Sequence, residues 1–162
     1  MLVADTSALV SLQHAAVLDT VLAEWDVATT ETVVAELGET ASYDDGDGAA
    51  AAAVLERESR LSVRSVGEVL TSSRIDAGEG SCAILARESG ADFLLTDDLR
   101  AVPELQRAVE AEVAISPIVL RALVERGALS REEALSKLAT LADRRSWLGS
   151  PIYRRARGLF EE

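Results

Sequence analysis

Short apolar runs alternate along this chain with longer segments of helical periodicity, and this alternation restricts the fold more than any other feature. Such runs suit the strands of a parallel sheet, which are buried on both faces because helices cover them. The runs fall at residues 2–4, 26–29, 61–66, 92–96 and 113–115. The pattern therefore predicts an α/β fold in which a central parallel sheet lies between layers of helices.

Segments of helical periodicity fill the intervals between these runs. They are expected at residues 7–23, with a break near Leu18, and at 31–39, 49–59, 67–73, 79–89, 99–111 and 117–125. Gly90 is expected to end one helix, and Pro103 to interrupt another. Residues 43–48, YDDGDG, have turn chemistry, so this acidic segment is predicted to be a solvated surface loop.

The last part of the chain is predicted to be helical, because the β-type runs stop after residue 115. Ser130 and Glu133 have the spacing of a capping box, and Pro151 suits the first position of a final helix. A chain of 162 residues has the length of one ordinary domain. We therefore predict a domain over residues 1–130 and a helical C-terminal extension over residues 131–162, packed on the same domain.

Charge is unevenly distributed along the chain, whose net charge is −12 from 16 basic and 28 acidic residues. Residues 1–56 contain no Lys or Arg, whereas residues 144–157 contain five arginines and no acid. Lys137 is the only lysine, and this bias together with the acid excess is typical of proteins from a salt-rich, halophilic cytoplasm. At molar salt the Debye length is about 3 Å, so the acidity does not exclude a nucleic-acid substrate.

The composition also predicts a cytoplasmic protein that does not enter a membrane. No apolar run approaches the roughly 18 residues that a membrane-spanning helix needs. The first residues, MLVADTSALV, lack the basic region and the cleavage site of a secretory signal. Cys82, the single cysteine, cannot form an internal disulfide and is expected to be an inert core residue.

Acidic residues stand where the predicted strands and helices meet. Asp5 follows the first strand and Asp97 and Asp98 follow the fourth, while Glu36 and Glu79 lie at the edge of buried helical faces. The carboxyl ends of parallel strands share one edge of a sheet, so these acids are expected to converge. Clustered carboxylates repel one another and need a cation. With one His and one Cys in the chain, Mg²⁺ or Mn²⁺ fits better than Zn²⁺, and metal-assisted phosphoryl chemistry is the expected reaction class.

Four motifs resemble those of the PIN domain, in the order and approximate spacing of VapC-like toxin ribonucleases. They are VADTSALVSL around Asp5, VVAEL around Glu36, DAGEGSCAILA around Glu79 and FLLTDDLRA around Asp98. The segment AISPIVLRALVERGALS is also similar to the tail of one PIN subgroup. The resemblance covers residues 2 to about 130. Each motif alone is weak, whereas four in order are specific.

The resemblance implies a three-layer α/β/α fold and an acidic pocket that holds Mg²⁺ or Mn²⁺. Carried over by motif, the catalytic metal ligands are Asp5, Glu36, Glu79 and Asp98. Asp97 would be a further ligand or a neighbouring group, and Ser7 and Thr96 would support the site. The implied activity is that of an endoribonuclease, the toxin of a type II toxin–antitoxin pair, neutralised by a small VapB-like antitoxin. The resemblance also implies a homodimer.

Each candidate residue also has a purely structural interpretation. Asp5 is a favoured helix N-cap, Glu79 suits the positive end of a helix dipole, and Glu36 could lie at the solvent edge of its helix. His14 is expected on the first helix as a partly exposed residue. The arginine group is interpreted as an exposed face, an RNA-backbone contact or a dock for an acidic partner segment. Its members are Arg144, Arg145, Arg154, Arg155 and Arg157.

Two other function classes compete with the ribonuclease. A catalytically inactive PIN module would bind RNA or a protein partner, and the retained set of acids argues against it. Phosphatases and phospho-acceptor receiver domains also use aspartates at strand ends. A receiver needs a lysine after its last strand, whereas Lys137 lies in the late helical region. A haloacid-type phosphatase needs a D-x-D motif, whereas this chain reads Asp5, Thr6, Ser7.

Overall fold

A five-stranded, all-parallel sheet forms the centre of the computed structural model, which describes residues 1–161. Its strands are β1 (Leu2–Ala4), β2 (Val27–Thr30), β3 (Ser62–Arg64), β4 (Phe93–Leu95) and β5 (Glu112–Ala114). The strand order is β3-β2-β1-β4-β5, so β1 is central and β2 and β4 flank it. The predicted central parallel sheet is confirmed, and all five strands lie within or beside the predicted runs.

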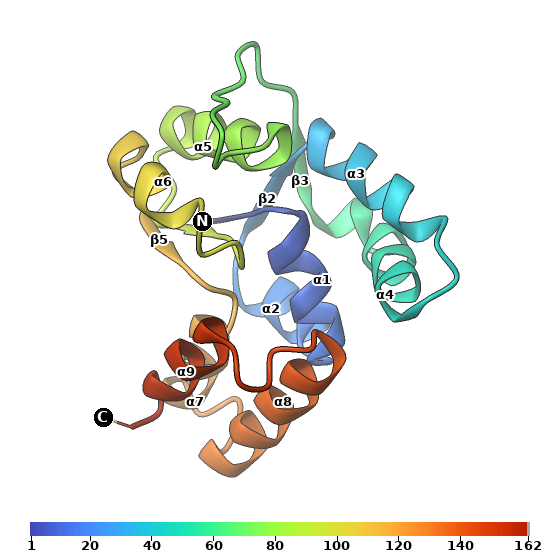
Figure 1. Cartoon of the computed structure of the whole chain (residues 1–162), viewed down its shortest axis with the longest axis vertical. Helices are drawn as coiled ribbons and strands as arrows, with labels where there is room; N and C mark the ends of the chain where they lie inside the picture. Colours follow the sequence, from blue (N-terminus) through green and yellow to red (C-terminus); the bar gives the residue numbers. More distant parts are fainter. Residues whose placement is uncertain (162) are drawn as a thin grey trace.

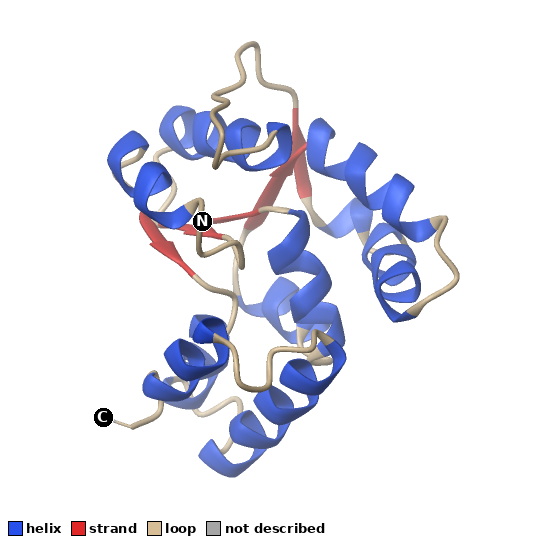
Figure 2. Cartoon of the chain, viewed as in Figure 1, coloured by secondary structure: helices blue, strands red, loops and turns tan. Residues whose placement is uncertain are grey.

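Helices cover both faces of this sheet and give the three-layer arrangement seen in Figures 1 and 2. They are α1 (Thr6–His14), α2 (Leu18–Glu24), α3 (Glu31–Ala41), α4 (Gly46–Leu55), α5 (Ala77–Ser89), α6 (Val102–Ala108), α7 (Ile118–Glu125), α8 (Arg131–Arg144) and α9 (Pro151–Gly158). A short 3₁₀ helix spans Glu58–Arg60. In Figure 1, α5 and α6 lie on one side of the strands and α1 and α2 on the other, while α3 packs against α4.

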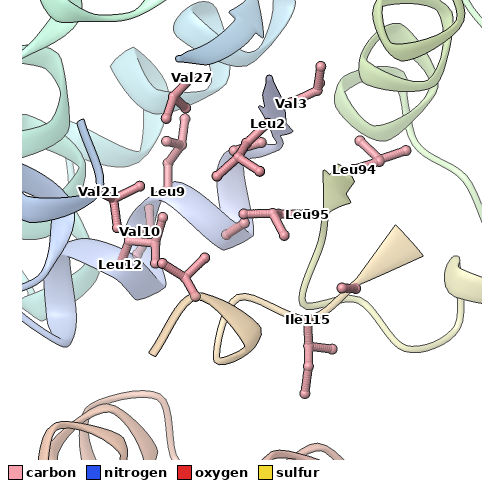
Figure 3. Close-up of a cluster of buried hydrophobic side chains, with 14 of the residues drawn as sticks. Leu2, Val3, Leu9, Val10, Leu12, Val21, Val27, Leu94, Leu95 and Ile115 are labelled. Atoms are coloured by element: carbon pink, nitrogen blue, oxygen red, sulfur yellow. The ribbon is translucent and has the colours of Figure 1, made fainter. Parts of the chain in front are cut away.

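The hydrophobic core forms between the strands and the helices that follow them. Val3 of β1 pairs with Ala28 of β2 and with Leu94 of β4. In Figure 3, Leu2 of β1, Leu9 of α1 and Leu95 of β4 gather on one side of the strands, whereas Val3 and Leu94 point to the other side. All of these residues are almost fully buried. This packing fixes the ends of β1 and β4 side by side, because Ala4 and Leu95 are partners at the last position of the register.

Local signals correctly located several helix boundaries. The capping box is present at the start of α8, where Ser130 and Glu133 satisfy each other's backbone N–H groups. Gly90 ends α5 in the left-handed conformation, with φ of 62°. The predicted break in the first helical segment separates α1 from α2, and Ala16 has a positive φ of 55° there.

Other boundaries differ from the prediction. Residues 67–73 form no helix, and the segment lies against α5: a Cβ on Gly80 would overlap the carbonyl oxygen of Leu70. Helix α4 begins inside the predicted loop 43–48, because the Asp45 carboxylate caps it by accepting the Gly48 N–H at 2.7 Å. Pro103 lies in the first turn of α6, where its missing N–H costs nothing, and so does not interrupt a helix.

The C-terminal helices pack against the α/β part of the chain. Helix α8 contacts both α1 and α7, and its buried face includes Leu138 and Leu141. Within residues 1–161, no single helix has the length and apolarity needed to cross a membrane. Helices α1 and α2 meet that requirement only as a pair bent by 113°, and their apolar side chains belong to the core.

Candidate active site

Asp5 links the central strand to the first helix. It follows β1 directly and caps α1: its Oδ1 accepts the Ala8 N–H at 2.9 Å and the Ser7 hydroxyl at 2.8 Å. The side chain is buried, yet it lines a cavity. Burial raises the pKa of Asp5 from 3.8 to about 7, although hydrogen bonds from Thr96, Ala8 and Ser7 oppose the shift. Capping and cavity lining are therefore compatible roles for this carboxyl group.

Glu36 reaches the same cavity from α3. Thr30 caps that helix, and Glu36 lies one turn and a half further on, where its Oε2 accepts the Thr6 hydroxyl at 3.0 Å. A Cβ on Gly78 would overlap Oε1 of Glu36, so the carboxylate lies directly against the first turn of α5. Partial burial raises the pKa of Glu36, and the Thr6 hydrogen bond opposes the rise.

Glu79 lies in the first turn of α5 and is buried. It forms a capping box with Asp76: the Asp76 Oδ1 accepts the Glu79 N–H at 2.8 Å, and the Glu79 Oε2 accepts the Asp76 N–H at 3.0 Å. Burial raises the pKa of Glu79, and the charges of Asp76 and Asp5 and a hydrogen bond with Asp98 add to the rise. The sequence interpretation missed Asp76, although its spacing from Glu79 is that of a capping box.

The two aspartates after β4 have different surroundings. Asp97 is half-buried, and its two carboxylate oxygens accept the backbone N–H and the hydroxyl of Ser116 at 2.7 and 2.8 Å. Asp98 is partly exposed, and its Oδ1 accepts the Arg100 N–H at 3.0 Å. Asp98 thus remains near Glu79 and solvent, while Asp97 joins β4 to the segment after β5.

The predicted supporting hydroxyls connect these acids. Ser7 donates to Asp5 and accepts the backbone N–H of Asp97 at 3.0 Å. Thr96 hydrogen-bonds the Asp5 carboxyl group, and its hydroxyl oxygen accepts the Asp98 N–H at 3.3 Å. Both side chains lie where the ends of β1 and β4 meet, so they hold the two strand ends in a fixed relation.

A cavity of about 290 Å³ brings three of the four predicted ligands together. Its acidic lining includes Asp5, Glu36 and Glu79. The remaining lining residues are Thr6, Ser7, Val10, Thr40, Asp47, Asp76 and Arg145. An adjoining hollow of about 140 Å³ is lined by Asp98, and Glu79 lines both hollows. Three of the four acids therefore line one cavity, and Asp98 lines a second hollow that shares Glu79 with it.

The donor chemistry of this region fits a hard divalent cation. All of its candidate ligands are carboxylate oxygens, and burial makes the charged forms of Asp5 and Glu79 costly without a cation. Among residues 1–161, however, no three His, Cys, Asp or Glu side chains already stand in an arrangement that would hold a metal ion. Glu36, Glu79 and Asp98 instead contact Thr6, Asp76 and Arg100, respectively.

Two expectations about the surroundings of the cavity are wrong. His14 is buried, with 4% of its surface exposed, because its Nε2 lies 2.7 Å from the Asp47 carboxylate. Asp47 therefore does not belong to a solvated loop. It lies in the first turn of α4, between His14 and the Arg145 guanidinium, whose Nη1 is 3.4 Å away. Neither contact could be read from the sequence, because 33 and 98 residues separate the partners.

The all-parallel sheet with acids at the ends of β1 and β4 defines the class of this protein, a three-layer α/β/α fold with an acidic cavity at the carboxyl edge of its sheet. A family model described as a PIN domain matches residues 1–162, so the chain belongs to the PIN domain family. This confirms the family indicated by the four motifs, and the match also includes the C-terminal helices. No curated protein and no solved structure gives a significant match to the chain.

Proposed function

We propose that this protein is an endoribonuclease that hydrolyses RNA phosphodiesters with Mg²⁺ or Mn²⁺ held by Asp5, Glu36, Glu79 and Asp98. One observation carries the proposal: acids from β1, α3 and α5 line a single cavity in a chain of the PIN domain family. Their positions in the sequence are far apart, and burial disfavours their charged forms without a counter-charge. Such an arrangement is expected where a dication balances the carboxylates.

The residues of the chain have separable tasks in this proposal. Ser7 and the Ala8 N–H fix the orientation of Asp5, and the Thr6 hydroxyl fixes that of Glu36. The Asp76 N–H fixes the orientation of Glu79, and the Arg100 N–H fixes that of Asp98. When bound, the dication supplies an acidified water as nucleophile and neutralises phosphate charge.

We further propose that the nuclease is the toxin of a type II toxin–antitoxin pair. The support is the similarity of the four motifs to VapC-like ribonucleases, which implies a VapB-like antitoxin as partner and a homodimer as assembly. A short neighbouring reading frame that encodes a DNA-binding antitoxin would support this role. Co-expression with that neighbour should then relieve growth arrest caused by the nuclease, whereas growth arrest that persists would count against the pairing.

A second candidate is an inactive PIN module that binds RNA or a protein. The observation that favours it is the absence, among residues 1–161, of a ready-made group of three metal-binding side chains. Titration with Mn²⁺ under thermal denaturation separates the two candidates. We expect Mn²⁺ to raise the midpoint of the wild type and not that of Glu79→Gln. Glu88→Gln, an exposed site on the same helix, is the matched control.

Cleavage of a fluorescent single-stranded RNA pool completes this test. Mn²⁺-dependent cleavage that EDTA stops would support the nuclease. Absence of both cleavage and a Mn²⁺-dependent thermal shift in the wild type would instead favour the inactive module.

A further inference from the structure

Arg145 differs from the rest of the arginine group because it reaches the candidate active site. It follows directly after α8 and lines the cavity that contains Asp5, Glu36 and Glu79. Its side chain is 19% exposed. The other members of the group, Arg144, Arg154, Arg155 and Arg157, are exposed. The C-terminal helices thus contribute one cation to a cavity built by the α/β part of the chain.

The backbone around Arg145 fixes its approach to the cavity. Helix α8 ends here, the chain reverses through Ser146 with φ of 56°, and Trp147 is buried as an anchor. On the cavity side, Asp47 accepts from Arg145, and the same Oδ1 atom lies 2.7 Å from the buried His14. Asp47 and His14 therefore act as positioning residues for the guanidinium.

Asp47 holds the Arg145 guanidinium in place but accepts from only one of its nitrogen atoms. Within residues 1–161, its one hydrogen bond runs from Nη1 to Asp47 over 3.4 Å. Arg57 provides a contrast, because its Nε and Nη2 both bind the Asp19 carboxylate, at 2.7 and 3.1 Å. A guanidinium has five N–H donors in a planar fork, so Arg145 retains donors that an incoming anion can accept.

The charges of the residues that line the cavity indicate which kind of anion would bind Arg145. Five acids and one cation line the cavity within the described residues. An RNA phosphate that enters it meets a strongly negative wall, and Arg145 is the one lining side chain that attracts it. Phosphate oxygens match the guanidinium fork, which forms two parallel charge-assisted hydrogen bonds with them.

We infer that Arg145 binds a backbone phosphate of the RNA, so that the C-terminal extension supplies part of the substrate site. The inference rests on the proposed ribonuclease function, because it takes RNA as the ligand of the acidic cavity. Arg145 contacts the phosphate, whereas Asp47 and His14 only orient Arg145. The competing interpretation is structural: Arg145 would serve only to attach the end of α8 to α4 through Asp47.

Two variants, Arg145→Ala and Asp47→Asn, separate these roles. Both break the Arg145–Asp47 ion pair, but only Arg145→Ala removes the guanidinium. The probe is a fluorescein-labelled, random-sequence single-stranded RNA of about 12 nucleotides, with binding measured by anisotropy in Ca²⁺. We expect Arg145→Ala to raise Kd about tenfold, as loss of a charge-assisted contact implies. Asp47→Asn keeps the guanidinium and an amide oxygen that can accept from it, and it removes a negative charge from the cavity lining, so its Kd should fall below that of the wild type. Arg144→Ala, the exposed neighbour, should stay within about twofold of the wild type.

Thermal midpoints and a second variant keep the test independent of folding. Arg145→Ala and Asp47→Asn should lower the midpoint by similar, small amounts, because they lose the same ion pair. Arg145→Gln keeps much of the side-chain volume without the charge and should show the same rise in Kd. Unchanged RNA binding by Arg145→Gln, or equal weakening by Asp47→Asn, would overturn the inference.

Cleavage in Mn²⁺, measured on the same proteins, distinguishes this inference from the proposed function. A wild type that cleaves RNA while the Arg145 variants bind it normally would leave the nuclease intact and refute the role of Arg145. A wild type that binds RNA through Arg145 without cleaving it would support the role of Arg145 and refute the nuclease. A wild type that fails to bind the RNA would refute the role of Arg145.

Discussion

The ends of β1 and β4 each carry an aspartate, and the two carboxyl groups differ in their surroundings. Asp5 lines the cavity, and burial raises its pKa to about 7. Burial also raises the pKa of Asp97, but both of its oxygens are occupied by the N–H and the hydroxyl of Ser116. The cavity lining includes Asp5 and does not include Asp97. Burial therefore raises the pKa of both carboxyl groups, whereas Asp5 alone of the two lines the cavity.

This difference separates a reactive acid from a structural one. A carboxyl group that accepts protein hydrogen bonds on both oxygens and lines no cavity acts as a brace, in this case between β4 and the segment after β5. A carboxyl group that is buried and still faces a cavity keeps coordination capacity for an ion. We therefore expect substitutions at Asp5 to affect chemistry and substitutions at Asp97 to affect stability.

The largest expected effect is the loss of cleavage in Asp5→Asn. The amide keeps the shape of the side chain and can still cap α1, but it removes the negative charge that a dication requires. We expect RNA cleavage in Mn²⁺ to fall by a factor of about 10³ or more, in the range seen when a main catalytic group is removed. A circular dichroism spectrum identical to that of the wild type would show that the fold is retained.

Asp97→Asn is the matched control for this experiment. Its amide oxygen can still accept the Ser116 N–H, so most of the cleavage activity should remain. Full cleavage by Asp5→Asn, or complete loss in Asp97→Asn alone, would reverse the assignment of the two residues.

The second effect is a fall in metal-free stability as the pH rises. The folded state holds a proton on Asp5 up to a pKa of about 7, whereas the unfolded state releases it near 3.8. The proton bound to Asp5 therefore stabilises the folded state fully below pH 3.8, and this stabilisation is lost as the pH rises towards about 7. From about pH 5 to about pH 8, the loss for one such group is about 3 kcal/mol. The raised pKa of Glu79 also makes the folded state less stable as the pH rises.

Urea denaturation in EDTA at several pH values measures this dependence. Asp5→Asn should be more stable than the wild type at the alkaline end and should show a shallower decline. Wild-type stability that rises over this pH interval would show that Asp5 is already ionised in the folded protein. We also expect Mn²⁺ to restore more stability at the alkaline end, because the ion binds the deprotonated carboxylates.

The third effect is the destabilisation expected for Asp97→Ala. This substitution leaves the N–H and the hydroxyl of the buried Ser116 without their partners. Two unsatisfied buried donors should lower the free energy of unfolding by about 2–3 kcal/mol, measured in urea at fixed pH. Asp92→Ala, an exposed aspartate beside the start of β4, should cost less than about 1 kcal/mol. Equal losses in the two variants would mean that Asp97 is no brace.

Local patterns were sufficient to predict the strands and the acids at their ends. The apolar runs located β1 and β4, and the shared edge of a parallel sheet then implied that Asp5 and the acids after β4 converge. The capping box at Ser130 was equally local. The capping box of Asp76 and Glu79 is equally local, but the pattern predicted that the helix begins at Glu79. What could be predicted thus depended on spacing within a few residues.

Tertiary contacts determine the features that the sequence did not reveal. Residues 67–73 have a helix-compatible pattern, yet the Leu70 backbone lies against Gly80 and the segment stays irregular. Asp47 and Arg145 meet only because α4, α1 and the end of α8 pack together. Burial of His14 follows from the same packing. No sequence pattern within either segment predicts a contact between Asp47 and Arg145. The cationic side of the cavity could therefore be identified only from the structure.

The smallest expected effect is that of Ser7→Ala, which tests the link between the two strand ends. The Ser7 hydroxyl donates to Asp5 and accepts the Asp97 N–H, so its removal costs one hydrogen bond on each side. We expect the free energy of unfolding to fall by about 1 kcal/mol, less than in Asp97→Ala. The Ser7 hydrogen bond lowers the pKa of Asp5, so its loss should also move the pH-dependent decline in stability to higher pH. Ser42→Ala, which removes an exposed hydroxyl at the C-terminal end of α3, should change neither quantity. A lower stability without a shift of the pH profile would mean that Ser7 supports the Asp97 backbone alone, and the two strand ends would then be electrostatically independent.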